Sequence, residues 1–371
     1  MKKVIVSVIN DLSTDQRVDK VCTTLMKCGY EVLLVGRRKK DSLTFKPRLY
    51  KTERMNLLFE KEIFFYAEYN FRLLFLLLFR KVDLLVSNDL DTLLPNYIVS
   101  KLKKIPLVYD SHEYFTGVPE LEHNQFARKV WTKIEKFIFP KLKHVFTVNQ
   151  SIANIYNKQY NIDVKIVRNI PLKREITVIK KKEELGLPLD KKILIYQGAG
   201  INIDRGTEEL IRSMQYIDNS ILLIIGSGDV IDTLKKDVND LNLTEKVIFI
   251  NKLPYGELFN FTANADLGFT LDKDTNINYR FSLPNKIFDY IHAGIPILAS
   301  DLVEVRNIIE EYKVGELIQT HEPHHIADKI NSMLNNTDML KQYRENAVKA
   351  AAILCWETEA QELIKVYMKY V

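Results

Sequence analysis

The chain alternates short apolar segments rich in β-branched residues with longer segments of helical period, and it runs through this order twice. Short apolar runs bounded by turn residues are typical of strands buried on both faces. Strands that alternate with helices form parallel sheets, because a helical crossover returns the chain to the same edge. The ten predicted strands are Val4–Ile9, Glu31–Val35, Val82–Ser87, Pro106–Tyr109, Val145–Val148, Lys192–Tyr196, Leu222–Ile225, Val247–Ile250, Leu267–Thr270 and Ile295–Ala299.

The length of 371 residues agrees with two such units, since one domain commonly takes about 100–200 residues. The order restarts after residues 167–171, where Pro171 disfavours helix in the preceding residue. We therefore predict an α/β protein of two doubly wound, Rossmann-like domains that face a cleft. These are residues 1–170 and 171–354, with a C-terminal helix over 355–371 that crosses back to the first domain. Ligands of such sheets bind beyond the carboxyl ends of the strands.

Composition narrows the class of protein and its partners. Hydrophobic residues make up 46% and charged residues 27%, which excludes a disordered or fibrous chain. A formal net charge of +5 does not require nucleic acid, and it leaves open the phosphates of a small ligand or an anionic membrane surface. Cys22, Cys28 and Cys355 fit neither a zinc spacing nor a disulfide framework, which favours a reducing cytoplasm.

Residues 63–81 form the most apolar segment, with the run LLFLLLF at 73–79. It is too short to span a bilayer, which needs about 20 apolar residues. One interpretation is a helix packed inside the first domain. The other is a helix whose aromatic face, flanked by Arg72, Arg80 and Lys81, rests on the inner face of the cell membrane.

The segment 282–301, SLPNKIFDYIHAGIPILASD, predicts a helix that leads into a buried strand. Pro284 suits the first turn of this helix, where its missing N–H costs no bond. Asn285 and Lys286 follow at the helix start, which favours binding of an anion. Asp289 lies three residues after Lys286 and therefore shares its face of the helix, so an ion pair between the two is the structural alternative.

Two glycine turns follow predicted strands in the second half. In the turn over 197–206, Gly198 and Gly200 let backbone N–H groups approach a phosphate, and the next helix begins near Thr207. The second turn ends at Gly228 and either approaches a ligand or only permits a tight turn.

In the first half, Asp11 ends the first predicted strand, so a ligand contact and a turn-forming role are both open. The next helix is predicted over Leu12–Leu25, with Ser13 or Thr14 as its N-cap. We interpret the start of the chain as a strand and not as a signal peptide, because its apolar run has only six residues.

His112 and Glu113 follow another predicted strand and are expected at the same sheet edge as Asp11. A cap or turn role is the alternative for Glu113. Asp89 and Asp91 form an Asp-x-Asp pair, whose carboxylates could bind a divalent metal but also suit the start of a helix. We favour the helix start and expect no metal site.

Taken in order, these motifs resemble the retaining GT-B glycosyltransferases of the large family 4 type, also called glycosyl transferases group 1, as found in bacterial surface-polysaccharide synthesis. The resemblance covers nearly the whole chain. It implies transfer of a hexose-type sugar from a nucleoside diphosphate sugar to a glycan or lipid-linked acceptor, with no cofactor, metal or nucleic acid. The elements that carry it are Asp15-Gln-Arg-Val18, Gly29-Tyr-Glu-Val32, Tyr109-Asp-Ser-His-Glu113, the Gly198 turn, Ile225-Gly-Ser-Gly228 and residues 282–301.

The resemblance also implies catalytic roles for three residues. Arg205 falls where the family commonly places a basic residue that neutralises the diphosphate. Ala199 stands at the other common basic position, so Lys286 would carry more of this charge. His112 would donate a hydrogen bond to the transferred sugar, and Gly228 would lie near the nucleobase.

The family's pair of motif glutamates is only half present. Asp289 matches the second, whose expected partner is the ribose, but Phe281 stands where the first would contact the sugar. Either Ser282 or Asn285 takes its place, or sugar recognition differs, and this puts retention of configuration in doubt. A GT-B nucleotide-sugar epimerase or phosphorylase, and a non-catalytic nucleotide-sugar binding protein, are the alternative functions.

Overall fold

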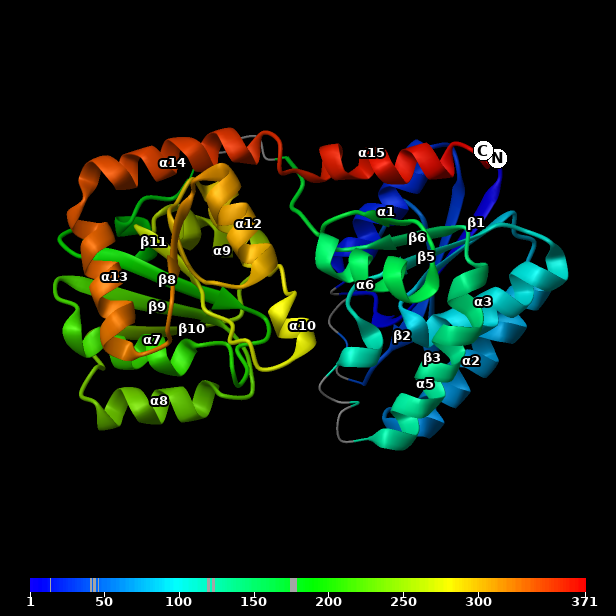
Figure 1. Cartoon of the computed structure of the whole chain (residues 1–371), viewed down its shortest axis with the longest axis horizontal. Coiled ribbons are helices and arrows are strands. Elements are labelled where there is room, and N and C mark those ends of the chain that lie inside the picture. The colour runs from blue at the N-terminus through cyan, green and yellow to red at the C-terminus, as the bar shows by residue number, and fades with distance from the viewer. Residues whose placement is uncertain are drawn as a thin grey trace. The chain divides into compact units, whose positions relative to one another are not determined.

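The structure is a computed structural model of the chain. It describes residues 1–13, 15–40, 42, 45, 47–118, 121, 124–173 and 179–371. The chain divides into two compact units (Figure 1). The first unit contains residues 1–169, 276–278 and 356–371, and the second contains residues 170–275 and 279–355.

The first unit is built on a seven-stranded parallel sheet with the order β3-β2-β1-β4-β5-β6-β7. Its strands are β1 Lys3–Asp11, β2 Glu31–Arg38, β3 Lys51–Asn56, β4 Leu84–Asn88, β5 Leu107–Ser111, β6 His144–Thr147 and β7 Val164–Ile166. Its α-helices include α1 Gln16–Lys27, α2 Glu62–Phe79, α3 Leu90–Lys103, α5 Gln125–Ile138, α6 Gln150–Tyr160 and α15 Trp356–Tyr367.

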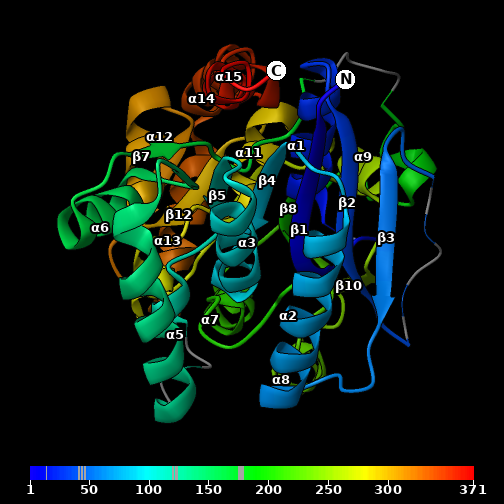
Figure 2. The same ribbon diagram turned by 90° about the vertical axis from the view of Figure 1, so that its right-hand side faces the viewer.

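Helices cover the strands of this sheet on both sides. Figure 2 shows α2, α3 and α5 together in front of the strands. The C-terminal helix α15 lies against α1 (Figure 1). There Trp356 is 3% exposed, and its Nε1–H donates to Thr24 Oγ1 at 3.1 Å. The C-terminal helix is therefore part of the core of the first unit.

The second unit is built on a six-stranded parallel sheet with the order β10-β9-β8-β11-β12-β13 and has apolar clusters on both faces. Its strands are β8 Lys192–Gly198, β9 Ser220–Gly226, β10 Val247–Asn251, β11 Leu267–Thr270, β12 Ile297–Ser300 and β13 Gly315–Ile318. The helices after residue 200 are α7 Thr207–Ser213, α8 Ile231–Asp240, α9 Tyr255–Ala263, α10 Ile277–Arg280, α11 Asn285–Ala293, α12 Val303–Tyr312, α13 Pro323–Asn335 and α14 Thr337–Ala351.

The prediction of two Rossmann-like α/β units is confirmed, and each of the ten predicted strands overlaps an observed strand. The first helix begins later than predicted, at Gln16, because the Asp15 side chain accepts a hydrogen bond from the Val18 N–H at 3.0 Å. The predicted start at Leu12 with a Ser13 cap is therefore wrong, and Thr14 lies outside the described residues.

Candidate functional site

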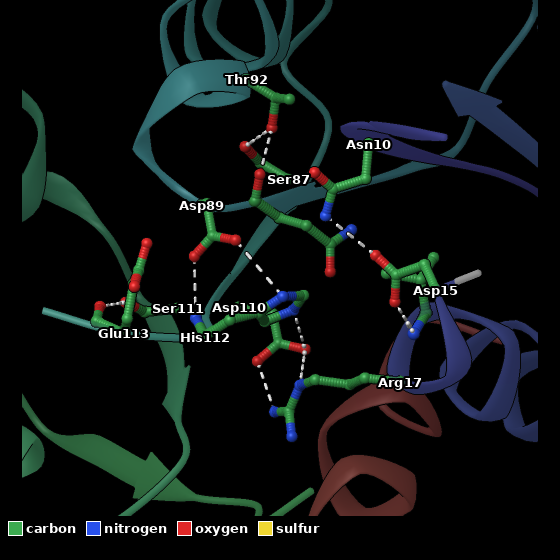
Figure 3. A network of polar contacts seen from close by, with 12 residues as sticks. Asn10, Asp15, Arg17, Ser87, Asp89, Thr92, Asp110, Ser111, His112 and Glu113 are labelled. Atoms are coloured by element: carbon green, nitrogen blue, oxygen red, sulfur yellow. Dashed lines mark hydrogen bonds and ion pairs between the residues drawn. The ribbon is translucent and has the colours of Figure 1, made fainter. Parts of the chain in front are cut away.

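A buried ion pair stands at the carboxyl edge of the first sheet (Figure 3). Arg17 from α1 donates two hydrogen bonds to Asp110 on β5, from Nε at 3.2 Å and from Nη2 at 2.7 Å. Its Nη1 donates to the Val167 carbonyl at 2.7 Å. Burial alone would raise the pKa of Asp110, but Arg17 and His112 hold it well below its usual range. The aspartate is therefore charged, buried and held by a bidentate partner.

His112 lies between two carboxylates (Figure 3). Its backbone N–H donates to Asp89 Oδ1 at 2.8 Å, and its ring Nδ1 lies 3.2 Å from Asp89 Oδ2. Its Nε2 is 3.7 Å from Asp110 Oδ2 and has no hydrogen-bond partner in the described part of the chain. Burial alone would lower the pKa of His112, but the two carboxylates raise it to about 9. At neutral pH the ring is therefore an imidazolium with one N–H left to donate.

The Asp-x-Asp pair has two different surroundings. Asp89 adopts a positive φ of 56°, which a non-glycine residue rarely does, and its N–H donates to the Asp110 carbonyl at 2.9 Å. Asp91 is buried in the first turn of α3, and burial together with Asp89 raises the pKa of its carboxyl well above the usual value. Among the described residues, no group of three or more His, Cys, Asp or Glu side chains lies where it could hold a metal ion.

Asp11 is held by its own turn. Its Oδ1 accepts hydrogen bonds from the N–H and the hydroxyl of Ser13, both at 3.0 Å, and Oδ2 accepts one from Ser42. Arg54 Nη2 lies 2.8 Å from Oδ1. Although burial raises the pKa of Asp11, these bonds lower it overall. The Glu113 side chain is exposed at the same edge of the sheet.

Arg205 lies in the turn after β8, at the carboxyl edge of the second sheet. It pairs with Asp272, which follows β11 and is 1% exposed, and its guanidinium stacks 4.2 Å from the centroid of the Tyr279 ring. Burial alone would lower the pKa of Arg205, but Asp272 raises it, so the guanidinium remains charged. Within the described residues, Arg205 Nε and Asp272 Oδ1 are buried without a hydrogen-bond partner.

Tyr196 on β8 brings the two predicted cations of the second unit together. Its hydroxyl donates to the Arg205 carbonyl at 3.0 Å, and Lys286 Nζ lies 3.8 Å from the centroid of its ring. Lys286 belongs to the first turn of α11, where Asn285 is exposed. The Ser282 hydroxyl points to Asp272 Oδ2 at 3.4 Å.

Asp289 turns toward β8 and α9. Its Oδ2 accepts from Gln197 Nε2 at 3.2 Å, and its Oδ1 accepts from the Tyr255 hydroxyl at 2.6 Å. Thr262 fixes the other end of the Gln197 amide at 2.7 Å. The carboxylate thus has firm partners from two elements, while the Lys286 ammonium rests on Tyr196.

The glycines of the two turns differ in whether packing leaves space for a side chain. A Cβ at Gly198 or Gly200 would meet no atom closer than 3.6 Å, so packing does not require glycine at either position. A Cβ at Gly228 would lie 1.9 Å from the Ile201 carbonyl oxygen, so packing accounts for this glycine without a ligand.

Sequence reasoning missed three charged residues, namely Arg17, Asp89 as the partner of His112, and Asp272. Asp89 and Asp272 each follow a buried apolar run at a sheet edge, and that signal could have identified them. The second unit also carries further buried polar atoms with no hydrogen-bond partner among the described residues. They are Oγ1 of Thr207, Oγ1 of Thr270 and one carboxyl oxygen each of Glu208 and Glu209.

Two family models match the chain one after the other. Residues 15–171 match Glycosyltransferase Family 4, and residues 178–350 match Glycosyl transferases group 1. Together they cover both units almost completely.

Known proteins give the same assignment. A D-inositol 3-phosphate glycosyltransferase of Corynebacterium glutamicum is 23% identical over 51% of this chain and 46% of its own length, so the match spans about half of that relative. A sucrose-phosphate synthase from Thermosynechococcus elongatus has a TM-score of 0.79 at 14% identity, covering 100% of this chain and 99% of its own. Anabaena HepE in complex with UDP-glucose has a TM-score of 0.74 at 17% identity, covering 100% of both chains. The chain belongs to the family 4 glycosyltransferases with the GT-B fold, the glycosyl transferases group 1.

Proposed function

We propose that this protein transfers a hexose-type sugar from a nucleoside diphosphate sugar to a glycan or lipid-linked acceptor, with retention of configuration, in surface-polysaccharide synthesis. The observation that carries the proposal is the pair of cations around Tyr196. Arg205 and Lys286 lie at the carboxyl edge of the second sheet, where parallel sheets bind ligands. Beside them lie buried polar atoms that have no hydrogen-bond partner within the described residues.

In this proposal the second unit, residues 171–354, binds the donor. Arg205 and Lys286 stabilise the negative charge that grows on the diphosphate as the sugar leaves, which is electrostatic catalysis by groups already in position. Asp289 binds the ribose. Asp272 Oδ1, which has no hydrogen-bond partner in the part of the chain that the structure describes, accepts from a sugar hydroxyl in place of the acid missing at Phe281. Gly198, Gly200, Gly228, Ser282 and Asn285 complete the donor site.

The first unit, residues 1–170 with the C-terminal helix, binds the acceptor. His112 donates from Nε2 to the transferred sugar, and the contact between its Nδ1 and Asp89 fixes the ring orientation for this task. Asp11 and Glu113 contact the acceptor or the diphosphate. A leaving phosphate oxygen takes the acceptor proton on the same face, so retention needs no protein nucleophile.

We further propose that α2 touches the inner face of the cell membrane. An inner stripe is at most 5% exposed and packs in the core, and it consists of Phe65, Tyr69, Leu73 and Leu77. An outer stripe is 43–81% exposed, and it consists of Phe71, Phe75 and Phe79. Exposed aromatic residues beside Arg72, Arg80 and Lys81 suit a membrane interface. In the described ranges, no helix is long and apolar enough to cross a membrane.

The test is a donor screen with the full chain. UDP-glucose is the first probe, because HepE binds it, followed by other UDP and GDP sugars. We expect one donor to raise the melting temperature and to yield free nucleotide and a glycosylated acceptor, whose anomeric configuration NMR then reports. An epimerised donor without nucleotide release, or tight binding without turnover, would contradict the proposal.

Two variants connect this activity to the site. Arg205→Lys keeps the charge but loses the planar fork that can bind a diphosphate through two hydrogen bonds. Lys286→Ala removes a charge. We expect both to weaken donor binding, and unchanged donor affinity in both would refute the site assignment.

A further inference from the structure

A cavity lies at the amino ends of the strands of the first sheet, opposite the end at which His112 lies. Its volume is about 430 Å³, within the roughly 300–1,000 Å³ common for ligand pockets. The cavity borders the starts of β5 and β6, where the helices that cover the sheet end. Among its lining residues are Lys101, Lys104, Lys141, Lys143, His144 and Tyr370.

We call Lys101, Lys104, Lys141 and Lys143 the lysine pocket. Within the described part of the chain, no carboxylate lines this cavity, and none of the four ammonium groups forms an ion pair. Other lysines of the molecule do have such partners, for example Lys51 with Glu31 at 2.7 Å. The pocket is therefore an unneutralised concentration of positive charge.

The pKa of His144 is consistent with positive charge around this cavity. Burial and the charges of Lys369, Lys143 and Lys165 lower the pKa of this histidine. The C-terminal dipole of α3 accounts for lysines in its last turn. It does not account for Lys143, which comes from the segment before β6, or for the convergence of both segments on one cavity.

Exposed apolar side chains lie at the C-terminal ends of α2, α3 and α5. Phe79, Leu102 and Phe137 are 81%, 66% and 58% exposed. Lys103 Nζ joins the ends of α2 and α3, since it donates to the carbonyls of Leu77 at 2.8 Å and Arg80 at 2.6 Å. Lys141 Nζ lies 3.2 Å from the centroid of the Phe137 ring. Apolar side chains next to lysines that form no ion pair among the described residues are the combination that binds an anionic lipid surface.

We propose that the lysine pocket binds the phosphate of an anionic phospholipid headgroup, while Phe79, Leu102 and Phe137 enter the bilayer interface. The proposal extends the contact suggested for α2 by naming the lipid chemistry and a site for it. It rests on the proposed membrane contact and is independent of glycosyl transfer, because the pocket and His112 occupy opposite ends of the strands of the first sheet.

The experiment measures sedimentation of the full chain with vesicles of phosphatidylcholine alone or mixed with phosphatidylglycerol. The pocket variant combines Lys101→Gln, Lys104→Gln, Lys141→Gln and Lys143→Gln. The control variant removes the same charge from exposed lysines of α8 and α14 by Lys235→Gln, Lys236→Gln, Lys341→Gln and Lys349→Gln. We expect the pocket variant to bind phosphatidylglycerol vesicles at least about tenfold more weakly than the wild type, and the control variant to bind as the wild type does.

Each other outcome is informative. Equal loss in both variants would show unspecific attraction by net charge, and absence of binding to phosphatidylglycerol vesicles would overturn the proposal outright. Saturable binding of inorganic phosphate without any vesicle binding would identify a soluble anion as the ligand and also overturn it.

A Phe71→Ser, Phe75→Ser variant tests the α2 contact separately, because it should weaken binding to both vesicle types. Nucleotide release from the donor without vesicles should be unchanged in the pocket variant, which separates this proposal from the proposed activity.

Discussion

At the carboxyl edge of the first sheet, two cations meet two carboxylates, Arg17 and His112 against Asp110 and Asp89. At the same edge of the second sheet, Arg205 pairs with Asp272 and stacks on Tyr279, and Lys286 lies on the ring of Tyr196. Both groups lie at the carboxyl ends of parallel strands. They differ in how far the chain itself satisfies their charges.

This difference separates folding from binding. In the first group each charge faces a buried opposite charge, so losing one neighbour should destabilise the unit, and His112 Nε2 is left without a hydrogen-bond partner in the described part of the chain. In the second group Arg205 Nε and Asp272 Oδ1 are buried without a hydrogen-bond partner among the described residues, and a ligand can satisfy them. Substitution of Arg17 should therefore mainly change stability, and substitutions around Lys286 should mainly change donor binding.

The largest effect is expected for Arg17→Leu. It leaves the Asp110 carboxylate buried and uncompensated, which typically costs about 3–5 kcal/mol of unfolding free energy. Urea unfolding followed by tryptophan fluorescence is the measurement, and both tryptophans, Trp131 and Trp356, belong to the first unit. Lys51→Met removes an exposed ion pair as a control and should cost at most about 1 kcal/mol. Equal losses of unfolding free energy in the two variants would contradict a stabilising role of the buried Arg17–Asp110 pair.

The next effect is a pH dependence caused by His112. Its pKa is raised to about 9 in the folded protein, against about 6.5 in the unfolded chain. The stabilisation is therefore complete below about pH 6.5 and is lost as pH rises through about 9, with an upper limit of roughly 3 kcal/mol. Unfolding free energies of the wild type and His112→Asn across this range measure it. If the unfolding free energy depends on pH equally in both proteins, the charge of His112 does not contribute to stability.

Whether a strand could be predicted from the sequence depends on how deeply it is buried in its sheet. All ten predicted strands have apolar runs, whereas β3, β7 and β13 were missed, and all three are edge strands of their sheets. β3 reads KTERMN and no residue of it is buried, while β7 has only three residues. An edge strand is covered less than a central strand, so its sequence lacks the apolar run that identifies the others.

The candidate site was predictable in its positions and less so in its pairings. The edge position of His112 and the turn that holds Arg205 both follow from the order of strands and helices. Their partners do not, because Arg17 and Asp110 are 93 residues apart in sequence and Arg205 and Asp272 are 67 apart. Such contacts depend on strand order, and a pattern within one segment contains no information about it.

Lys286→Met tests the second group with a smaller effect. It removes a cation that the chain does not pair with a carboxylate in the described residues, so stability without donor should hardly change. Affinity for the donor nucleotide should fall about tenfold or more, since a hydrogen bond to a charged group contributes about 1.5–3 kcal/mol. Titration calorimetry measures the affinity, and Lys252→Met, an exposed lysine of the same unit, is the control. A loss of stability as large as that of Arg17→Leu would erase the distinction between the two groups.

Gly200→Ala should have the smallest effect on folding and still change binding. A Cβ there would have Asn202 Nδ2 as its nearest neighbour at 3.8 Å, so unfolding free energy should stay within about 1 kcal/mol of the wild type. Donor affinity should nevertheless fall, because the new methyl group stands where backbone N–H groups are proposed to approach the diphosphate. The matched variant Gly228→Ala forces a Cβ to 1.9 Å from the Ile201 carbonyl oxygen and should cost about 1–3 kcal/mol by overpacking. Thermal unfolding with and without nucleotide separates the two results. If Gly200→Ala binds nucleotide as tightly as the wild type, the open polar atoms of the second unit serve some other ligand than the diphosphate.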